Sequence, residues 1–351
     1  MQPWVYIAAY TVPGVAALGI WLGEGWTWMT PAYVFAVIPM LDVIVGRDVQ
    51  NRDAAAEAKA KSTLLYSLIL WFFPVVALGL IVLLGFSWSD LSGLGAQAGA
   101  ILSVSLALGG IGITIAHELI HRSSPWERHL GTAILTLVCY PHFTIEHVRG
   151  HHANVATHED PASAQRGESF YRFWIRSVTG QLRSAWHLEE ARLLKKQSPV
   201  WSNENLMLRY ALIQVAWLIT VMLVFGVSFL VPYFLMSIGA FSLLEAVNYV
   251  EHYGLERHQK ANGKYERVDE HHSWNSDHLV SRALLFELTR HSDHHMEARR
   301  PYQTLRSHAT APELPTGYPG MILLALVPPL WYRTMHPRLV GIDQDLDLVR
   351  E

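Results

Sequence analysis

"ILSVSLALGGIGITIAHELIH", residues 101–121, joins an apolar run directly to two histidines that lie four residues apart, His117 and His121. An apolar helix of about 20 residues is long enough to cross the hydrocarbon core of a bilayer. Residues at positions i and i+4 of a helix share one face, so both imidazoles are expected to point the same way. The stretch therefore predicts a membrane helix that carries a pair of candidate metal ligands at its end.

The rest of the chain also indicates a membrane protein. Of its 351 residues, 51% are apolar and only 16% are charged, which is a low charge content for a soluble protein. Apolar runs of spanning length also occur near residues 4–22, 26–45 and 64–86. The run 210–247 is too long for one crossing and fits two that are joined by a tight turn near Gly226. We therefore predict an all-α bundle of six transmembrane spans, the first of which lacks the features of a cleaved signal peptide.

The basic residues predict the orientation of the bundle. All 27 Lys and Arg residues lie in 47–61, in 122–209 and from 257 onward. Basic residues close to span ends stay in the cytoplasm. We therefore expect an inner (cytoplasmic) membrane protein with both termini on the cytoplasmic side. The predicted order is four spans in 1–121, a cytoplasmic segment in 122–209, two spans in 210–247 and a second cytoplasmic segment in 248–351.

The histidines are concentrated in four short stretches, and the predicted topology brings all four to the cytoplasmic side. After His117 and His121 come "EHVRGHH", "NYVEHYGLE" and "RHSDHH", which contain His147, His151, His152, His252, His291, His294 and His295. Helical pairs at i,i+3 and i,i+4 share a face, while an adjacent histidine such as His152 turns about 100° away. Neighbouring histidines can therefore serve two metals, and we expect a histidine-rich helical cap that houses a dinuclear metal site.

The motif H-E-x-x-H at His117 to His121 also occurs in zinc peptidases, where the intervening glutamate, here Glu118, acts as the base. A catalytic zinc takes three protein ligands, whereas the four stretches supply nine imidazoles. The count favours two metals over a single zinc. Imidazole suits iron, copper, zinc and nickel alike, so the spacing leaves the metal open. The single cysteine, Cys139, excludes an intramolecular disulfide and a multi-cysteine metal site.

Metal-bound imidazoles need partners that hold their second ring nitrogen. Carboxylates beside the clusters are expected to support an imidazole, to bridge the metals or to be ordinary solvated charges: Glu118, Glu146, Asp160, Glu251, Asp277 and Asp293. His272 is open between a ligand and a supporting residue. Seven further histidines lack the cluster spacing and are interpreted as ordinary: His129, His142, His158, His187, His258, His308 and His336.

Taken together, "HELIHR", "EHVRGHH…EDPASA", "NYVEHYGL" with "HHSWNSDH", and "LTRHSDHHMEARRPYQTLR" resemble the integral-membrane alkane 1-monooxygenases. These belong to the histidine-rich non-haem diiron family of membrane proteins, which also holds xylene monooxygenases and fatty acyl desaturases. The histidine boxes alone indicate the wider family, and "NYVEHYGL", "SWNSDH" and "RPYQTLR" narrow the resemblance to the alkane hydroxylase branch. The resemblance extends over nearly the whole chain, although family members often have a longer segment before the first span.

The resemblance implies that two iron ions activate dioxygen and that the terminal methyl group of medium-chain n-alkanes is hydroxylated to a 1-alkanol. It assigns all nine clustered histidines as iron ligands. The chain shows no flavin or dinucleotide fingerprint and no haem is expected, so electrons must come from a partner. The family uses rubredoxin and an NADH-dependent rubredoxin reductase. Basic residues that are candidates for rubredoxin docking, or that simply pair with the carboxylates, are Arg149, Arg299, Arg300 and Arg306.

An apolar substrate is expected to enter from the bilayer through a cavity along the span that ends at His121. The small residues Gly109, Gly110, Gly112 and Ala116 of that span allow close helix packing or leave room for a slender ligand. Three other functional classes of protein stay open. They are a related diiron enzyme (an aryl-methyl, xylene-type monooxygenase or a fatty acyl desaturase), a membrane zinc peptidase and a metal transporter, whose spans should carry polar residues. No nucleic-acid partner is expected.

Overall fold

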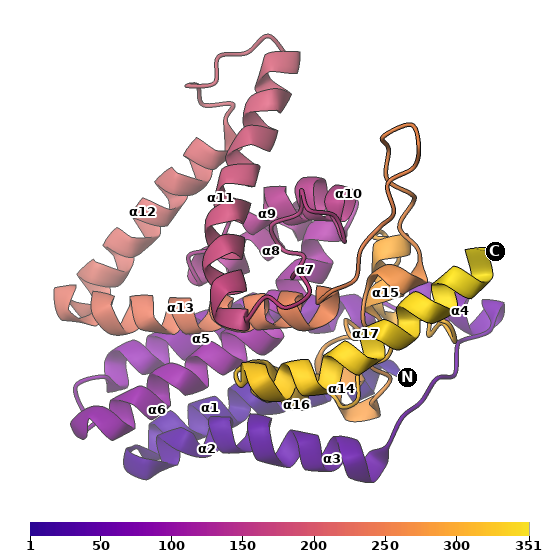
Figure 1. The fold of residues 1–351 in the computed structure, drawn as a ribbon. Helices are drawn as coiled ribbons and strands as arrows, with labels where there is room; N and C mark the ends of the chain where they lie inside the picture. The colour runs from indigo at the N-terminus through magenta and orange to yellow at the C-terminus, as the bar shows by residue number, and fades with distance from the viewer. Residues whose placement is uncertain (351) are drawn as a thin grey trace.

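The computed structural model describes residues 1–350, which form helices and loops without a β-strand (Figure 1). Within this part of the chain, six stretches are long and apolar enough to cross a membrane: Pro3–Leu22, Glu24–Val45, Leu65–Ser87, Gly93–His121, Leu206–Phe225 and Val227–His252. The prediction of an all-α protein with six spans is confirmed. The last span continues to His252, beyond the predicted limit at residue 247, so the third histidine stretch belongs to the membrane helix.

Several spans consist of more than one helical segment. Span 1 contains η1 (Pro3–Tyr10) and α1 (Thr11–Leu22), and span 2 contains η2 (Glu24–Trp28), α2 (Met29–Ala32), η3 (Tyr33–Val37) and α3 (Ile38–Val45). Span 3 is α5 (Leu65–Ser87), and span 4 joins α6 (Gly93–Leu106), η4 (Ala107–Gly112) and α7 (Ile113–His121). Span 5 is α12 (Leu206–Phe225), and span 6 joins η6 (Val227–Phe229) to α13 (Leu230–His252). Gly226, at φ +87°, forms the predicted tight turn between spans 5 and 6.

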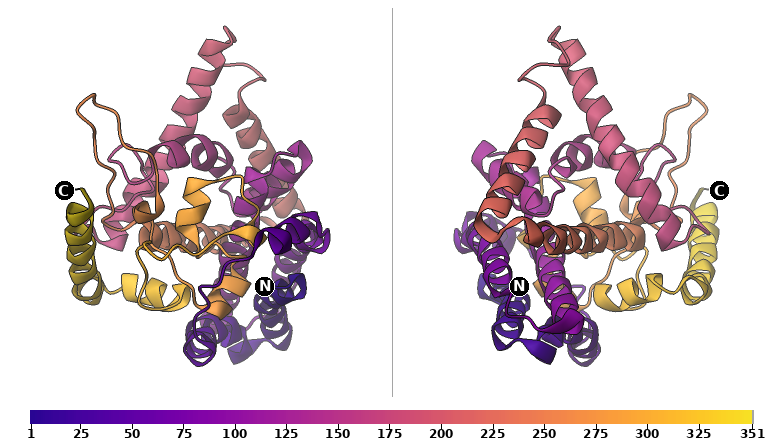
Figure 2. Two further views of the ribbon diagram at one scale, coloured as in Figure 1. Left: turned by 90° about the vertical axis from the view of Figure 1, so that its right-hand side faces the viewer. Right: turned by 90° about the vertical axis from the view of Figure 1, so that its left-hand side faces the viewer.

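The remaining helices surround the ends of spans 4 and 6. They are α4 (Ala54–Ser62), α8 (Pro125–Leu137), α9 (Phe143–Glu146), η5 (His147–His151), α10 (His152–Asn154), α11 (Phe170–Lys195), η7 (Glu270–His272), α14 (Leu279–Leu284), α15 (His291–Met296), η8 (Tyr302–Thr304), α16 (Tyr318–Ala325) and α17 (Pro328–Arg350). In two further views, α11 and α12 project from the rest of the molecule, whereas α15 lies near its middle (Figure 2).

Burial identifies span 4 as the central helix of the bundle. Of its most apolar 18-residue window, 78% is buried, compared with 6% for α12. Large apolar side chains such as Trp21, Val43, Phe86 and Leu223 are exposed on the outer faces of the spans. A soluble protein rarely exposes so much apolar surface, whereas a lipid environment requires it.

Spans 4 and 6 approach each other through small residues. A Cβ atom at Gly109 would lie 2.5 Å from the carbonyl oxygen of Ala240, and one at Gly239 would lie 2.4 Å from Oγ of Ser105. Ser105 donates a hydrogen bond to the carbonyl oxygen of Met236 at 2.9 Å. Gly109 therefore serves the close packing that its position in span 4 predicts.

Span 2 contains a buried carboxylate within an otherwise apolar segment. Asp42 is 2% exposed, and its carboxylate accepts hydrogen bonds from the backbone N–H of Ser281 at 2.9 Å and from its hydroxyl at 2.6 Å. Because α14 begins at Leu279, the first of these bonds satisfies an N–H group in its first turn that has no partner within the helix. Span 2 is thereby joined to the segment that leads into the last histidine stretch.

The close contact at Gly109 can be tested with a matched pair of glycine variants. Gly109→Ala should lower the midpoint of thermal unfolding in detergent, because overpacking a tight helix contact costs about 1–3 kcal/mol. Gly79→Ala in α5 is the control, since a Cβ there meets nothing within 4 Å. Equal midpoints for the two variants would contradict the assigned packing of span 4 on span 6.

Candidate metal centre

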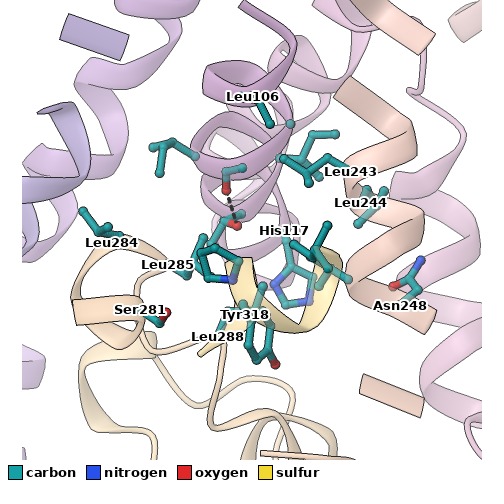
Figure 3. Close-up of a pocket in the computed structure, with 18 of the residues that line it drawn as sticks. Leu106, His117, Leu243, Leu244, Asn248, Ser281, Leu284, Leu285, Leu288 and Tyr318 are labelled. Atoms are coloured by element: carbon teal, nitrogen blue, oxygen red, sulfur yellow. Dashed lines mark hydrogen bonds between the residues drawn. The ribbon is translucent and has the colours of Figure 1, made fainter. Parts of the chain in front are cut away.

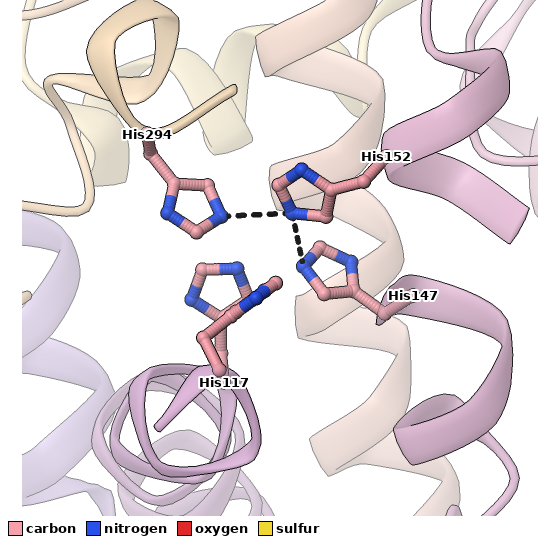
Figure 4. Close-up of side chains that lie close together, drawn as sticks. His117, His147, His152 and His294 are labelled. Atoms are coloured by element: carbon pink, nitrogen blue, oxygen red, sulfur yellow. Dashed lines mark hydrogen bonds between the residues drawn. The ribbon is translucent and has the colours of Figure 1, made fainter. Parts of the chain in front are cut away.

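Nine histidines from five helical elements form two groups at the ends of spans 4 and 6. In the first group, His117 and His121 come from α7, and each of the five members offers a ring nitrogen within 4.8 Å of the others: His117, His121, His147, His152 and His294. Four of these imidazoles point toward one another in Figure 4. Nε2 of His152 lies 3.2 Å from Nε2 of His147 and 3.0 Å from Nε2 of His294.

The second group meets the same distance limit and contains His151, His252, His291 and His295. Nε2 of His291 lies 3.2 Å from Nε2 of His252 and 3.0 Å from Nε2 of His295. The structure thus brings all nine clustered histidines together and divides them between two candidate metal positions.

The second histidine stretch differs from the prediction in one respect. The sequence pattern pairs His147 with His151 on one helical face and turns His152 away, whereas the structure pairs His147 with His152 and turns His151 toward the second group. The cause is local. Residues 147–151 form a π-helical turn, η5, in which hydrogen bonds run from i to i+5 and the helix is wider than an α-helix. The wider turn brings His152 closer to the face of His147 than an α-helix would, and the two share a group.

The arrangement of the ring nitrogens fits bound cations. Nε2 of His152 faces two other Nε2 atoms, as does Nε2 of His291, yet a neutral imidazole carries one proton on one nitrogen. These contacts cannot all be hydrogen bonds. In addition, Nε2 of His117, His121 and His151 is buried without a hydrogen-bond partner. Buried polar atoms need partners, and a metal ion within each group would satisfy them.

Burial keeps these imidazoles in the form that binds metals. It lowers the pKa of His147, His152, His291, His294 and His295 well below the ordinary histidine value, and neighbouring imidazoles in the cluster lower it further. Neutral imidazole is the ligating species, and it suits borderline transition metals.

Asp160 supports an imidazole of the second group. Its Oδ2 lies 2.8 Å from Nδ1 of His151 and accepts a hydrogen bond from the hydroxyl of Ser163 at 2.6 Å. Burial opposes the charge of Asp160, but the His151 ring and the Ser163 hydroxyl together hold the pKa of the carboxyl below its usual value. A charged Asp160 fixes the proton of His151 on Nδ1 and directs Nε2 into the group.

Glu251 lies on the other side of the same group. Its Oε1 accepts a hydrogen bond from the hydroxyl of Tyr318 at 2.7 Å, and its Oε2 lies 3.2 Å from Nε2 of His291, the nitrogen that faces His252 and His295. Of the six predicted carboxylates, Glu251 is thus placed beside nitrogens that would hold a metal, whereas Asp160 lies behind one.

The other four carboxylates have partners outside the histidine groups. Glu118 pairs with Arg122 at 2.8 Å, and Oε1 of Glu146 accepts from the hydroxyl of Ser184 at 3.2 Å. Asp277 pairs with Arg290 at 2.9 Å, and Asp293 lies 2.8 Å from Nε2 of His308. His308 had no cluster spacing, so nothing in the sequence connected it to Asp293.

Two further predictions concern His272 and the arginines. Both ring nitrogens of His272 have partners outside the groups, because Nδ1 accepts from the N–H of Asp269 at 3.0 Å and Nε2 lies 3.2 Å from Glu266. Of the four arginines that were candidates either for docking or for pairing with carboxylates, Arg149, Arg300 and Arg306 pair with carboxylates. Arg299 is exposed.

An apolar cavity, partly open to the outside, adjoins the histidines (Figure 3), and its empty space including the open mouth is about 820 Å³. Residues from spans 1, 2, 4 and 6 and from α14 and α16 line it. His117 and His147 of the first group and His291 of the second reach its surface. Leu106 also lines it, eleven residues before His117 and therefore about 16 Å away along span 4. The cavity thus extends along the bundle away from the metal positions.

Comparison with known proteins agrees with this arrangement. The family model described as fatty acid desaturase matches residues 92–325. Alkane 1-monooxygenase 2 of Pseudomonas aeruginosa is 41% identical over 96% of this chain and 91% of its own length. An alkane 1-monooxygenase of Acinetobacter baylyi is 39% identical over 88% of this chain and 76% of its length. The hydroxylase component of a Pseudomonas putida xylene/toluene monooxygenase is 29% identical over 95% of this chain and 89% of its own length. These matches confirm the resemblance.

The role of Asp160 leads to a test by metal analysis. Asp160→Asn should reduce the metal content of the purified protein, because supporting partners of metal-bound histidines typically contribute 10–100-fold in metal affinity. Glu159→Gln, an exposed neighbour, should keep the full content. Elemental analysis of both variants after dialysis against a weak chelator measures the difference. Equal metal content would show that Asp160 does not support His151.

Proposed function

Since the chain belongs to the fatty acid desaturase family and, within it, to the alkane 1-monooxygenases, we propose that it converts medium-chain n-alkanes to 1-alkanols. In this proposal two non-haem iron ions occupy the two histidine groups, and rubredoxin supplies electrons. The observation that carries the proposal is the cavity, which is apolar along the spans and meets imidazoles of both groups at its surface.

The lining of the cavity supports an unfunctionalised alkane as the substrate. Away from the histidine groups, two of its polar side chains are occupied by protein partners: Thr114 donates to the carbonyl oxygen of Gly110 at 2.7 Å, and Ser281 donates to Asp42. Binding would therefore rest on apolar burial, which contributes about 0.8 kcal/mol per CH₂ group. A chain aligned with span 4 presents its end to His117, so a methyl group meets the metal positions before any methylene does.

We assign the five histidines of the first group to one iron and the four of the second group, with Glu251 beside them, to the other. Bound there, the two ions supply the redox chemistry that activates dioxygen. The protein contributes the rest. Neutral imidazoles keep the sites in place, Asp160 orients His151, Tyr318 holds Glu251, and the apolar walls exclude water from the substrate.

Electrons must reach the irons from a separate protein. Only His121 and His152 among the nine histidines are partly exposed, and both belong to the first group. We therefore place electron entry at the first group and propose rubredoxin, reduced by an NADH-dependent reductase, as the donor. Arg299 is exposed and suits an acidic carrier, while Arg149, Arg300 and Arg306 are engaged with carboxylates. The basic segments that flank the spans support a cytoplasmic position for this face in the inner membrane.

A fatty acyl desaturase is the main alternative within the family. Such an enzyme must hold an acyl head group and present carbons from the middle of the chain. Among the described residues that line the cavity there is no lysine or arginine to bind a carboxylate or phosphate. The alkane is therefore the better match. The similarity to the xylene/toluene monooxygenase component keeps aryl methyl groups as a second substrate class.

The function is tested with purified protein in lipid nanodiscs, loaded with iron and supplied with rubredoxin, its reductase and NADH. We expect 1-octanol from n-octane, detected by gas chromatography with mass spectrometry, and two irons per chain. A variant with His294→Ala should lose turnover. Iron-loaded protein that yields only internal alkenes or secondary alcohols would overturn the proposal.

The length of the cavity generates a further prediction. Leu106→Trp should fill the end remote from the histidines and shift the preferred substrate to shorter alkanes, since each methylene that no longer fits costs about tenfold in specificity. Competition between n-hexane and n-dodecane measures the shift. Leu78→Trp on the exposed face of α5 is the control and should leave the ratio unchanged. An unchanged ratio for Leu106→Trp would place the substrate elsewhere.

A further inference from the structure

A second apolar feature lies near the C-terminus, in "YPGMILLALVPPLWY", residues 318–332. This stretch is uncharged, yet it is too short to cross a bilayer. It falls in the segment 248–351, which the distribution of basic residues predicts to be cytoplasmic. In the structure it forms α16 and the first turn of α17, on the outside of the bundle (Figure 2). We call residues 318–332 the C-terminal hairpin.

The C-terminal hairpin packs beside the spans well inside their ends. Tyr318, Met321 and Ile322 belong to one apolar cluster with Ala246 and Tyr249 of span 6. Leu243 of span 6 and Phe35 of span 2 pack against the same cluster. Leu243 lies nine residues before the end of span 6 and Phe35 ten before the end of span 2, which places them about 13–15 Å inside those ends. Span 6 has 26 residues and is therefore about 39 Å long, about 9 Å more than a hydrocarbon core about 30 Å thick, so Leu243 lies inside the core even if all of the excess is at the histidine end.

The outward face of the hairpin is apolar and exposed. Leu323, Leu326, Val327 and Leu330 are 39–51% exposed. The face continues onto exposed apolar residues on both sides, Met40 and Val43 of span 2 and Tyr171 and Ile175 of α11. The hydroxyl of Tyr171 donates to the carbonyl oxygen of Leu326 at 2.8 Å, so α11 and the hairpin meet directly. A continuous surface of this kind suits acyl chains and not water.

The inward face of the hairpin lines one side of the cavity. Tyr318, Pro319 and Ile322 line the cavity together with Val34 of span 2 and Val247 of span 6. Val34 and Val247 are only partly buried, and α16 packs beside both spans at this point. Ile322 faces the cavity while its neighbour Leu323 is exposed. α16 therefore has one face on the cavity and another on the outside of the molecule.

We propose that the C-terminal hairpin is inserted into the lipid leaflet next to the histidine groups, where acyl chains cover its outward face and α16 separates the substrate cavity from the hydrocarbon. The alkane then reaches the cavity from this leaflet and not from the aqueous side. The insertion itself does not depend on the proposed alkane hydroxylation. Only the identity of the molecule behind α16 rests on that function.

The test uses single cysteines labelled with the fluorophore NBD in a Cys139→Ser background, reconstituted in phosphatidylcholine vesicles. Leu326→Cys and Leu330→Cys probe the hairpin. Leu223→Cys on the exposed face of α12 is the lipid control, and the exposed Arg338→Cys in α17 is the aqueous control. Each vesicle sample receives either doxyl-labelled lipid or iodide as the quencher, and size-exclusion elution and far-UV circular dichroism confirm the fold of each labelled protein.

We expect blue-shifted emission at positions 326 and 330, quenching by doxyl lipid comparable to that at position 223, and no quenching by iodide. Quenching by iodide, as at position 338, would show that the hairpin lies in water. Protection from both quenchers would show that protein covers the face, for example a second copy of the chain. Either result overturns the insertion. Because the readout is optical, its failure is distinguishable from an absence of alkane hydroxylation.

Discussion

The structure depends on burying uncharged imidazoles from four distant stretches against one another at the rim of a membrane bundle. Ring nitrogens 3.0–3.2 Å apart repel unless a proton or a cation lies between them. Three local features support that arrangement. Span 4 ends in His117 and His121, span 6 continues to His252, and the hydroxyl of Ser163 and the carboxylate of Asp160 hold His151. In small metal-dependent domains the binding energy of the ion is part of the folding energy, and metal ions bound in these two groups would contribute to the stability of the fold in the same way.

The sequence was sufficient to predict the bundle, because membrane spans follow from the length and polarity of a segment alone. It was sufficient for the convergence of the histidines because an even number of spans separates the second stretch from the third. It was not sufficient for their division between the two groups, since the wider π-helical turn at residues 147–151 brings His152 closer to the face of His147. The sequence also could not separate Asp160 and Glu251 from the other four carboxylates. Which oxygen lies 3 Å from which nitrogen depends on helices that are far apart in the chain.

The roles of two features of the chain could not be predicted from its composition. Asp42 lies within an apolar run, and only the folded protein reveals its partner, Ser281, 239 residues later. Residues 318–332 have the composition of a span but not its length, so counting by span length passes over them. Both cases concern elements whose role comes from neighbours that no sequence interval predicts. His308 is similar, because its contact with Asp293 depends on the path of the loop after α15.

The hydrogen bond from Tyr318 to Glu251 connects two parts of the molecule that have different surroundings. Tyr318 opens α16, whose outward neighbours are exposed, while Glu251 stands 3.2 Å from a ring nitrogen of His291. A displacement of α16 must therefore move or break a contact at the second histidine group. Thermodynamic reciprocity applies to such a linkage: whatever alters the seating of α16 alters the geometry around Glu251, and occupancy of the histidine group restrains α16 in return. With α16 inserted in the lipid leaflet as proposed, membrane thickness and lipid order would become variables of the metal centre.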